Sequence, residues 1–179
     1  MVLLLLHASP SAAETVEQLD MRTRRDDPVA HYIVLCARKS EPWGSGHSFV
    51  VWVKQDGVSG ETESAAYGFY PEIEKVVLHL FVGRGVVADE STKAASIKPE
   101  LLTHRFVVRV DREAFDAGLA VRDRWRQGRR DYNLFGSNCM HFTREVSKAI
   151  GLVAPEAKFG ERPRDFIPRL MAAQSMLMR

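Results

Sequence analysis

Apolar residues form short runs over the first two thirds of the chain, and each run has the length of a β-strand. The runs at 30–37 (AHYIVLCA), 47–53 (HSFVVWV) and 76–82 (VVLHLFV) are rich in branched and aromatic residues. A mixed segment at about 62–70 ends at a proline, and the run at 104–110 (HRFVVRV) carries charged residues on one face. These segments are therefore predicted to be strands.

The spacing of apolar residues changes to a helical period in the last third of the chain. A helix is expected over 111–127, with Asp111 as its N-cap and Gly128 at its end. A second helix is expected from about Asn138 to Ile150, and the amphipathic stretch 165–178 predicts a third, with a proline in its first turn. Strands followed by helices are typical of an α+β domain.

Three polar segments are predicted to lie outside these elements. Residues 14–29 are charged and are interpreted as a linker or a short helix. The Gly-Arg-Gly at 83–85 is interpreted as a turn, and 88–100 as a polar loop. The catalytic or binding domain is therefore expected to cover 30–179, and 1–29 to form an N-terminal tail.

The first residues of this tail resemble part of a signal peptide. Residues 2–6 are apolar, and the small residues at 11–13 resemble a cleavage site. The positive start of a signal peptide is missing, and the apolar stretch is short. The sequence thus leaves two locations open, an exported or periplasmic one and the cytoplasm. No stretch approaches the ~20 apolar residues of a transmembrane helix.

Composition narrows the classes of function. A chain of 179 residues with 45% hydrophobic residues can form one domain with its own core. A formal net charge of +2 gives no electrostatic argument for binding nucleic acid. The cysteines, Cys36 and Cys139, are too few for a disulfide framework, and no CxxC or HExxH motif indicates zinc. No metal or other cofactor is therefore expected.

Cys139 occupies the start of the predicted helix 138–150, within the stretch YNLFGSNCMHFTREV. The N-terminus of a helix favours a thiolate over a thiol, and its N–H groups can hold an oxyanion. Asn138 is a good N-cap for this helix. The alternative interpretation is core packing, which is the usual role of a free cysteine and the one expected for Cys36 in mid-strand.

A nucleophilic cysteine needs a base, and several histidines compete for this role. His47 opens a predicted strand after a Gly-Ser-Gly turn, where small residues leave room for a substrate or a facing helix. His141 is two residues beyond Cys139 on the same helix and therefore points away from it. His79 and His104 are the remaining interior candidates, and His79 lies in mid-strand in an apolar run, where a core histidine is the usual outcome. His47 is therefore the preferred base.

The stretch around Cys139 resembles the cysteine motif of the PPPDE peptidases, which include deSUMOylating isopeptidases. The matching residues are Tyr132-Asn133-Leu134-Phe135, Asn138-Cys139, Phe142 and Glu145-Val146. The run from Asn138 to Phe142 is also similar to the lecithin–retinol acyltransferase-like proteins. Both groups belong to the circularly permuted branch of the papain-like, NlpC-type superfamily. There a histidine precedes the cysteine at the start of a strand, and the run from Gly46-His47 to Trp52 is similar to that element.

This resemblance, which extends loosely over 30–155, implies a circularly permuted papain-like fold, with an antiparallel sheet packed against the helix that carries Cys139. It implies a cysteine peptidase-like or amidase-like hydrolase that forms a thioester acyl-enzyme. His47 would take the proton of Cys139, and Asn138 and the Cys139 backbone would cap the helix and hold the oxyanion. The implied substrate is a peptide of the bacterial cell wall (peptidoglycan) or an isopeptide bond of a protein, the latter also fitting a toxin or effector.

Several points stay open from the sequence. Glu63, Ser64 and Tyr67 on the next strand all compete as the residue that orients His47, and a dyad without a third member is equally open. The same dyad could transfer an acyl group from an ester or a phospholipid, although no long apolar segment follows the helix. A third hypothesis is a non-catalytic binding module in which Cys139 is inert.

Two surfaces are candidates for contact with a partner or a substrate. Trp43, Gly46 and Tyr132 are expected to line a substrate cleft. The arginines of 121–131 are interpreted as a solvated helix face anchored by Trp125. The alternative is a docking surface for an anionic partner such as cell-wall polymer, phospholipid headgroups or an acidic protein. The arginines concerned are Arg122, Arg124, Arg126, Arg129 and Arg130.

Overall fold

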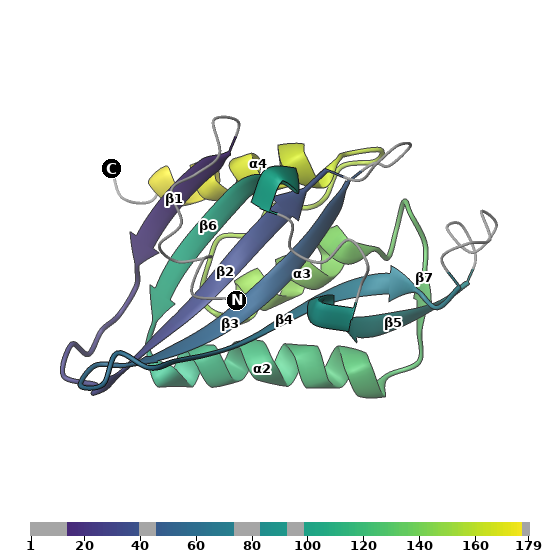
Figure 1. The fold of residues 1–179 in the computed structure, drawn as a ribbon. Helices are drawn as coiled ribbons and strands as arrows, with labels where there is room; N and C mark the ends of the chain where they lie inside the picture. The colour runs from purple at the N-terminus through teal and green to yellow at the C-terminus, as the bar shows by residue number, and fades with distance from the viewer. Residues whose placement is uncertain (1–13, 40–45, 74–82, 93–98, 177–179) are drawn as a thin grey trace.

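A mixed β-sheet forms the framework of the computed structural model, which describes residues 14–39, 46–73, 83–92 and 99–176. Seven strands of the described chain pair in the order β1-β6-β2-β3-β4-β5-β7 (Figure 1). Neighbouring strands are antiparallel, except that β1 runs parallel to β6. The strands are β1 (Thr15–Asp20), β2 (Val29–Arg38), β3 (His47–Asp56), β4 (Thr62–Pro71), β5 (Gly83–Asp89), β6 (Leu102–Val110) and β7 (Arg130–Tyr132).

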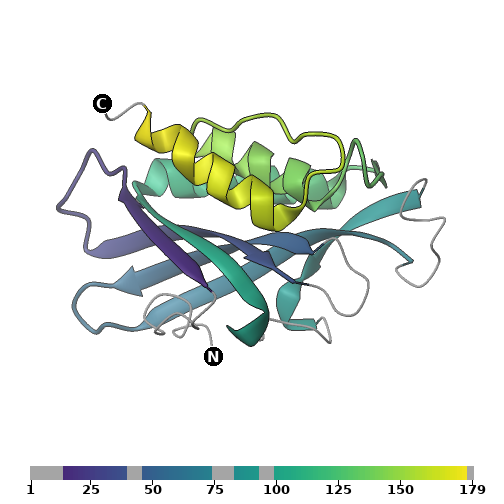
Figure 2. The same ribbon diagram turned by 90° about the horizontal axis from the view of Figure 1, so that it is seen from above.

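Three described helices cover one face of this sheet, as Figure 2 shows. They are α2 (Arg112–Gln127), α3 (Cys139–Ala149) and α4 (Pro163–Ser175), and two short 3-10 turns, η2 (Glu90–Thr92) and η3 (Pro99–Leu101), precede β6. None of the described helices combines the length and the apolar character needed to cross a membrane. The α+β class expected from the order of strands and helices is confirmed.

The strands alternate in the side chains that they present to the two faces, as the period of a β-strand requires. Ile33 and Leu35 of β2 pair with Trp52 and Val50 of β3 and pack under the helices. Their neighbours point to the other face, where a second cluster of buried apolar residues forms. This cluster contains Val34, Cys36, Phe49, Val51, Val53, Ala66, Leu102 and Val107. Cys36 is thus a core residue, as expected.

The segment 14–29, expected to be a linker or short helix, contains strand β1. Its residues are mostly exposed, because β1 lies at the edge of the sheet and needs no apolar run. Strand β1 is held in place by backbone pairing with β6 and by a buried ion pair at its start. Arg105 Nε donates to Glu14 Oε1 at 2.5 Å, and both side chains are 3% exposed. The sheet therefore begins before the domain boundary predicted at residue 30.

The Gly-Arg-Gly predicted as a turn lies within β5, which also includes the start of the predicted loop 88–100. Gly85 is needed there because the ring of Phe69 packs directly on its backbone, where an added Cβ would overlap it. The predicted strand 76–82 falls outside the described residues. The sheet is also not wholly antiparallel, since β1 and β6 run in the same direction.

The predicted helices are confirmed as α2, α3 and α4, with differences at their ends. Asp111 precedes α2 but makes no side-chain cap within it. Its carboxylate instead accepts hydrogen bonds from the backbone N–H and the hydroxyl of Thr23, so it ties the segment after β1 to this helix. Helix α4 begins at Pro163, which places Pro168 inside the helix rather than in its first turn.

Candidate active site

Cys139 is the first residue of α3, and the loop before it is fixed by two asparagines. The Asn133 side chain accepts hydrogen bonds from the N–H groups of Phe135 and Gly136 and forms a tight turn. Asn138 is the N-cap: its Oδ1 accepts from Met140 N at 2.9 Å and its Nδ2 donates to the Leu134 carbonyl at 2.6 Å. Cys139 is therefore held at a defined position, 5% exposed.

His47, the first residue of β3, lies against Cys139. The two side chains lie close enough to shift each other's pKa, and Ser48 also lies close enough to the sulfur to lower the pKa of Cys139. Ser48 is in turn held by Thr143 of α3, whose hydroxyl lies 3.1 Å from that of Ser48. The start of β3 and the start of α3 thus meet through four polar side chains: the imidazole of His47, the thiol of Cys139 and the hydroxyls of Ser48 and Thr143.

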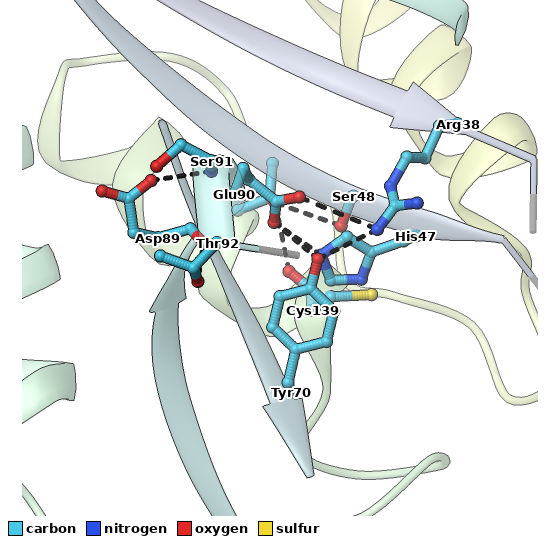
Figure 3. Close-up of polar contacts among 10 residues, drawn as sticks. Arg38, His47, Ser48, Tyr70, Asp89, Glu90, Ser91, Thr92 and Cys139 are labelled. Carbon is cyan, nitrogen blue, oxygen red and sulfur yellow. Dashed lines mark hydrogen bonds and ion pairs between the residues drawn. The ribbon is translucent and has the colours of Figure 1, made fainter. Parts of the chain in front are cut away.

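A wholly buried glutamate lies on the other side of the imidazole. Glu90 Oε1, from η2, is 3.2 Å from His47 Nε2 and accepts the Tyr70 hydroxyl at 2.7 Å. Arg38 Nη2 donates to the Tyr70 oxygen at 3.0 Å and lies 3.7 Å from Glu90 Oε2. Figure 3 shows Arg38, Tyr70 and Glu90 converging beside His47, with the Cys139 sulfur next to the ring. Because Nε2 faces Glu90, Nδ1 is the nitrogen that can serve Cys139.

Two further contacts fix the imidazole plane. The rings of His47 and Tyr70 stack with their centroids 4.1 Å apart and their planes inclined by 25°. Gly68 of β4 lies against the pair, since a Cβ added there would overlap both His47 Nε2 and Glu90 Oε1. Only a residue without a side chain lets the histidine and the carboxylate approach each other at this point.

The surroundings favour charged forms of both members of the pair. Burial alone lowers the pKa of His47, but the charges of Cys139 and Glu90 and their hydrogen bonds outweigh it and raise this pKa to about 9. Burial alone raises the pKa of Cys139, but His47 and the Ser48 hydrogen bonds outweigh it and lower this pKa. A thiolate beside an imidazolium is the form of a nucleophile with its acid–base partner.

Glu90 stays ionised despite its burial. Burial raises the pKa of Glu90, but hydrogen bonds from His47 and Tyr70 and the charges of His47 and Arg38 outweigh it, so this pKa falls below its usual value. Cys36 shows the opposite case. Burial raises the pKa of its thiol well above the ordinary range, and the charge of Arg105 offsets this rise only in part.

A cleft with a volume of about 200 Å³ opens beside Cys139. Gly46, Tyr132 and Asn138, which the sequence singled out, line it together with Cys139. Gly46 has a φ of +89°, and an added Cβ would lie 2.8 Å from the Arg38 carbonyl, so glycine is required there. Trp43, the other residue expected in the cleft, falls outside the described residues.

The residues expected to orient His47 lie elsewhere. Ser64 and Glu63 of β4 pair with Val53 and Lys54, near the far end of β3 from His47, roughly 20 Å away at 3.3 Å per residue. They line a second cleft, between β3, β4 and α2. Tyr67 packs against Trp52. Glu90 takes the expected role, and it was missed because it belongs to a segment predicted as a polar loop, where no local pattern marks a buried carboxylate.

Two other histidines considered as the base, His141 and His104, have different surroundings in the structure. His141 Nδ1 lies 3.0 Å from the Asn138 side chain and completes the cap of α3. His104 pairs with Ala37 in the sheet, and burial lowers its pKa. His79 falls outside the described residues.

The arginine-rich segment is anchored within the protein. Glu145 of α3 accepts from Trp125 Nε1 at 2.5 Å and pairs with Arg124 and with Arg130, which also stacks over the Trp125 ring. Arg122 lies over Tyr67 and pairs with Asp123. This agrees with the interpretation of a solvated face anchored by Trp125, while a docking role for Arg122, Arg126, Arg129 and Arg130 stays a prediction.

Among the residues that the structure describes, no group of histidine, cysteine and acidic side chains is arranged to hold a metal ion. Comparisons with protein-family models, with curated proteins and with solved structures give no match to this chain.

Proposed function

We propose that this protein is a cysteine hydrolase that cleaves an amide bond through Cys139 and His47. The observation that carries the proposal is the position of Cys139 beside His47, whose Nε2 lies 3.2 Å from the buried Glu90 carboxylate, next to an open cleft. A cysteine that served only as core filling would need neither an ionised partner nor a cleft.

The reaction follows from the charges of the pair. The Cys139 thiolate attacks the carbonyl carbon, and a C–S bond forms while the carbonyl electrons move to oxygen. As the tetrahedral intermediate collapses, the His47 imidazolium gives its proton to the leaving nitrogen, and the C–N bond breaks. A thioester remains on Cys139, and the amine departs.

The second half of the reaction regenerates the enzyme. Neutral His47 takes a proton from a water molecule, whose oxygen attacks the thioester carbon. The C–S bond breaks, a carboxylic acid leaves, and the thiolate and imidazolium are restored. Glu90 supports both halves because its charge stabilises the imidazolium and its hydrogen bond orients the ring.

The oxyanion of each intermediate has a binding site at the start of α3. Cys139 is the first helical residue, so its N–H has no acceptor within the helix. The helix N-terminus adds roughly half a positive charge at the same place. Asn138 positions these groups through its cap to Met140 N.

The resemblance to permuted papain-like proteins supports the same reaction, with a cell-wall peptide or a protein isopeptide as the substrate. A papain-like fold is part of this proposal, since the helix that bears Cys139 packs on the sheet that presents His47. Hydrolysis or transfer of an ester acyl group by the same dyad is the alternative reaction.

The test is the pH dependence of iodoacetamide alkylation at Cys139, followed by mass spectrometry, with buried Cys36 as the internal control. An ordinary thiol titrates near ~8.5, whereas an activated one reacts well below ~7.5. We expect fast alkylation of Cys139 at pH 6 and its loss in His47→Ala. Slow alkylation that is equal in the wild type and in His47→Ala would refute the proposed dyad.

A further inference from the structure

We propose that the cleft beside Cys139 binds one apolar, uncharged side chain of a peptide or protein substrate, adjacent to the amide bond that is cleaved. This inference rests on the proposed function and adds the class of substrate. It follows from the lining, the rim, the charges and the size of the cleft.

The lining of the cleft is mainly apolar. Leu134, Met140 and Pro163 contribute aliphatic and thioether side chains, and Phe135 and Tyr132 contribute aromatic rings. These residues come from the loop before α3, from α3 itself and from the start of α4. An apolar side chain gains free energy when it leaves water for such surroundings, whereas a charged one loses hydration without gaining a partner.

An exposed aromatic pair extends this apolar surface outward. The rings of Phe135 and Phe159 stack with their centroids 4.6 Å apart and their planes inclined by 16°. Phe159 is 81% exposed and Phe135 is 43% exposed, and Phe159 precedes Gly160, which lines the cleft. Single exposed apolar residues are common, but a contiguous aromatic pair at the edge of an apolar cleft marks a binding surface.

The one carboxylate among the described lining residues, that of Glu161, is already paired with a cation. Glu161 accepts hydrogen bonds at 2.8 Å from Arg169 Nε and Arg169 Nη2, and a third from Lys158 N. Among the described lining residues, a cationic substrate group therefore finds no free carboxylate, and an acidic group finds no cationic side chain. The cleft thus disfavours both charged classes and selects a neutral side chain.

The size of the cleft favours a single amino-acid side chain over a lipid acyl chain as its occupant. Pockets that enclose a whole small-molecule ligand measure roughly 300–1,000 Å³. A volume of about 200 Å³ is smaller and suits one large side chain of a substrate whose remainder lies outside. A peptide with leucine or phenylalanine at this position fits that description.

The test uses reagents that react with Cys139 whether or not hydrolysis occurs. N-acetyl-leucyl, N-acetyl-glycyl and N-acetyl-glutamyl chloromethyl ketones are compared by their second-order rates of labelling of Cys139, measured by intact-protein mass spectrometry. Each rate is divided by the rate with iodoacetamide, which has no side chain to bind. We expect the leucyl reagent to react about tenfold faster than the glycyl one, and the glutamyl reagent to be slowest.

Variants of the aromatic pair test whether Phe135 and Phe159 contribute to the preference for the leucyl reagent. Phe159→Ala and Phe135→Ala should each reduce the preference for leucyl over glycyl by about threefold or more, after each rate is divided by the iodoacetamide rate of the same variant. Val58→Ala is the matched control, because Val58 is an exposed apolar residue on the turn between β3 and β4 and should have no effect. Circular dichroism of each variant verifies the fold.

The outcomes separate the two proposals. Equal rates for the three peptidyl reagents, with fast iodoacetamide alkylation, would overturn the apolar subsite and leave the nucleophile intact. Slow labelling by every reagent would overturn both proposals. A decanoyl chloromethyl ketone that reacts faster than the leucyl reagent would also overturn this inference, because the cleft would then be an acyl-chain site.

Discussion

Glu90 and His47 are 43 residues apart in the sequence, yet Glu90 Oε1 lies 3.2 Å from His47 Nε2 in the interior of the protein. The carboxylate has no exposed surface, so water screens its charge only weakly and its attraction for the imidazolium is strong. Tyr70 and Arg38 hold it from the opposite side. Glu90 is thus a positioning residue that acts on Cys139 through His47.

Glu90→Gln should slow the alkylation of Cys139 at pH 6. The substitution keeps the shape but removes the charge that favours the imidazolium, so the pKa of His47 falls. A hydrogen bond between charged groups contributes about 1.5–3 kcal/mol, which corresponds to about 10- to 150-fold in rate. Glu72→Gln is the matched control, since Glu72 pairs with Arg84 at the surface. Unchanged alkylation in Glu90→Gln would remove Glu90 from the proposed site.

The charged pair should exist only within a window of pH. His47 has a folded pKa of about 9, above its ordinary 6.5, so its stabilising contribution is complete below about 6.5 and disappears as the pH rises through about 9. Cys139 has a lowered pKa, so its contribution is complete above its ordinary 9.0 and disappears as the pH falls through the folded value. Both groups are charged between the two folded values.

Two rates should therefore diverge at high pH. Alkylation needs only the thiolate and should persist above pH 9. Hydrolysis of an amide such as N-acetyl-leucine p-nitroanilide needs the imidazolium as acid and should fall there. Parallel pH profiles for alkylation and hydrolysis above pH 9 would contradict His47 as the acid.

Gly68→Ala should separate His47 from Glu90. The new Cβ would overlap both His47 Nε2 and Glu90 Oε1, so one side chain must move. We expect a loss of Cys139 reactivity at pH 6 of about tenfold or more, together with about 1–3 kcal/mol of stability lost to overpacking. Gly136→Ala is the control, because nothing lies near its added Cβ. Urea unfolding and alkylation rates measure the two effects.

Glu14→Gln should destabilise the protein without changing the chemistry at Cys139. It removes the charge that Arg105 pairs with in the interior, and breaking a buried ion pair costs about 3–5 kcal/mol. Glu17→Gln, on the exposed side of β1, should have little effect. Chemical denaturation of both variants measures the difference. Equal stability of the two variants would show that the Glu14–Arg105 pair contributes little.

The sequence predicts the elements whose side chains repeat with a clear period. Strands β2, β3 and β6 carry apolar runs because both of their faces are buried, and helices α2 and α3 carry a helical period because each buries one face. Strand β1 carries none, because an edge strand of six mostly exposed residues is held by backbone pairing and by one ion pair. A local pattern of apolar residues indicates which side chains are buried, and β1 has few buried side chains.

The residues of the candidate site likewise fall into those with a local signal in the sequence and those without one. The structure brings Cys139 and His47 together, and both had local signals: a helix start and a strand start after small residues. Glu90, Tyr70 and Arg38 meet only through the register of β2, β3, β4 and β5 and the turn that follows β5. That register is a property of the assembled sheet, so no short stretch of sequence could reveal the third member.

Strand β1 is synthesised well before β6, the strand with which it pairs. Thr15 pairs with His104, which is 89 residues later (104 − 15), and a ribosome adds about 5–20 residues per second. The strand is therefore made about 4–18 s before β6, while β2, β3 and β4 can already pair as consecutive hairpins. Until β6 arrives, the apolar edge of β2 is open to other chains. The nascent protein is thus most prone to aggregate just before its sheet closes, and the thiolate forms only after that interval, when α3 has been synthesised.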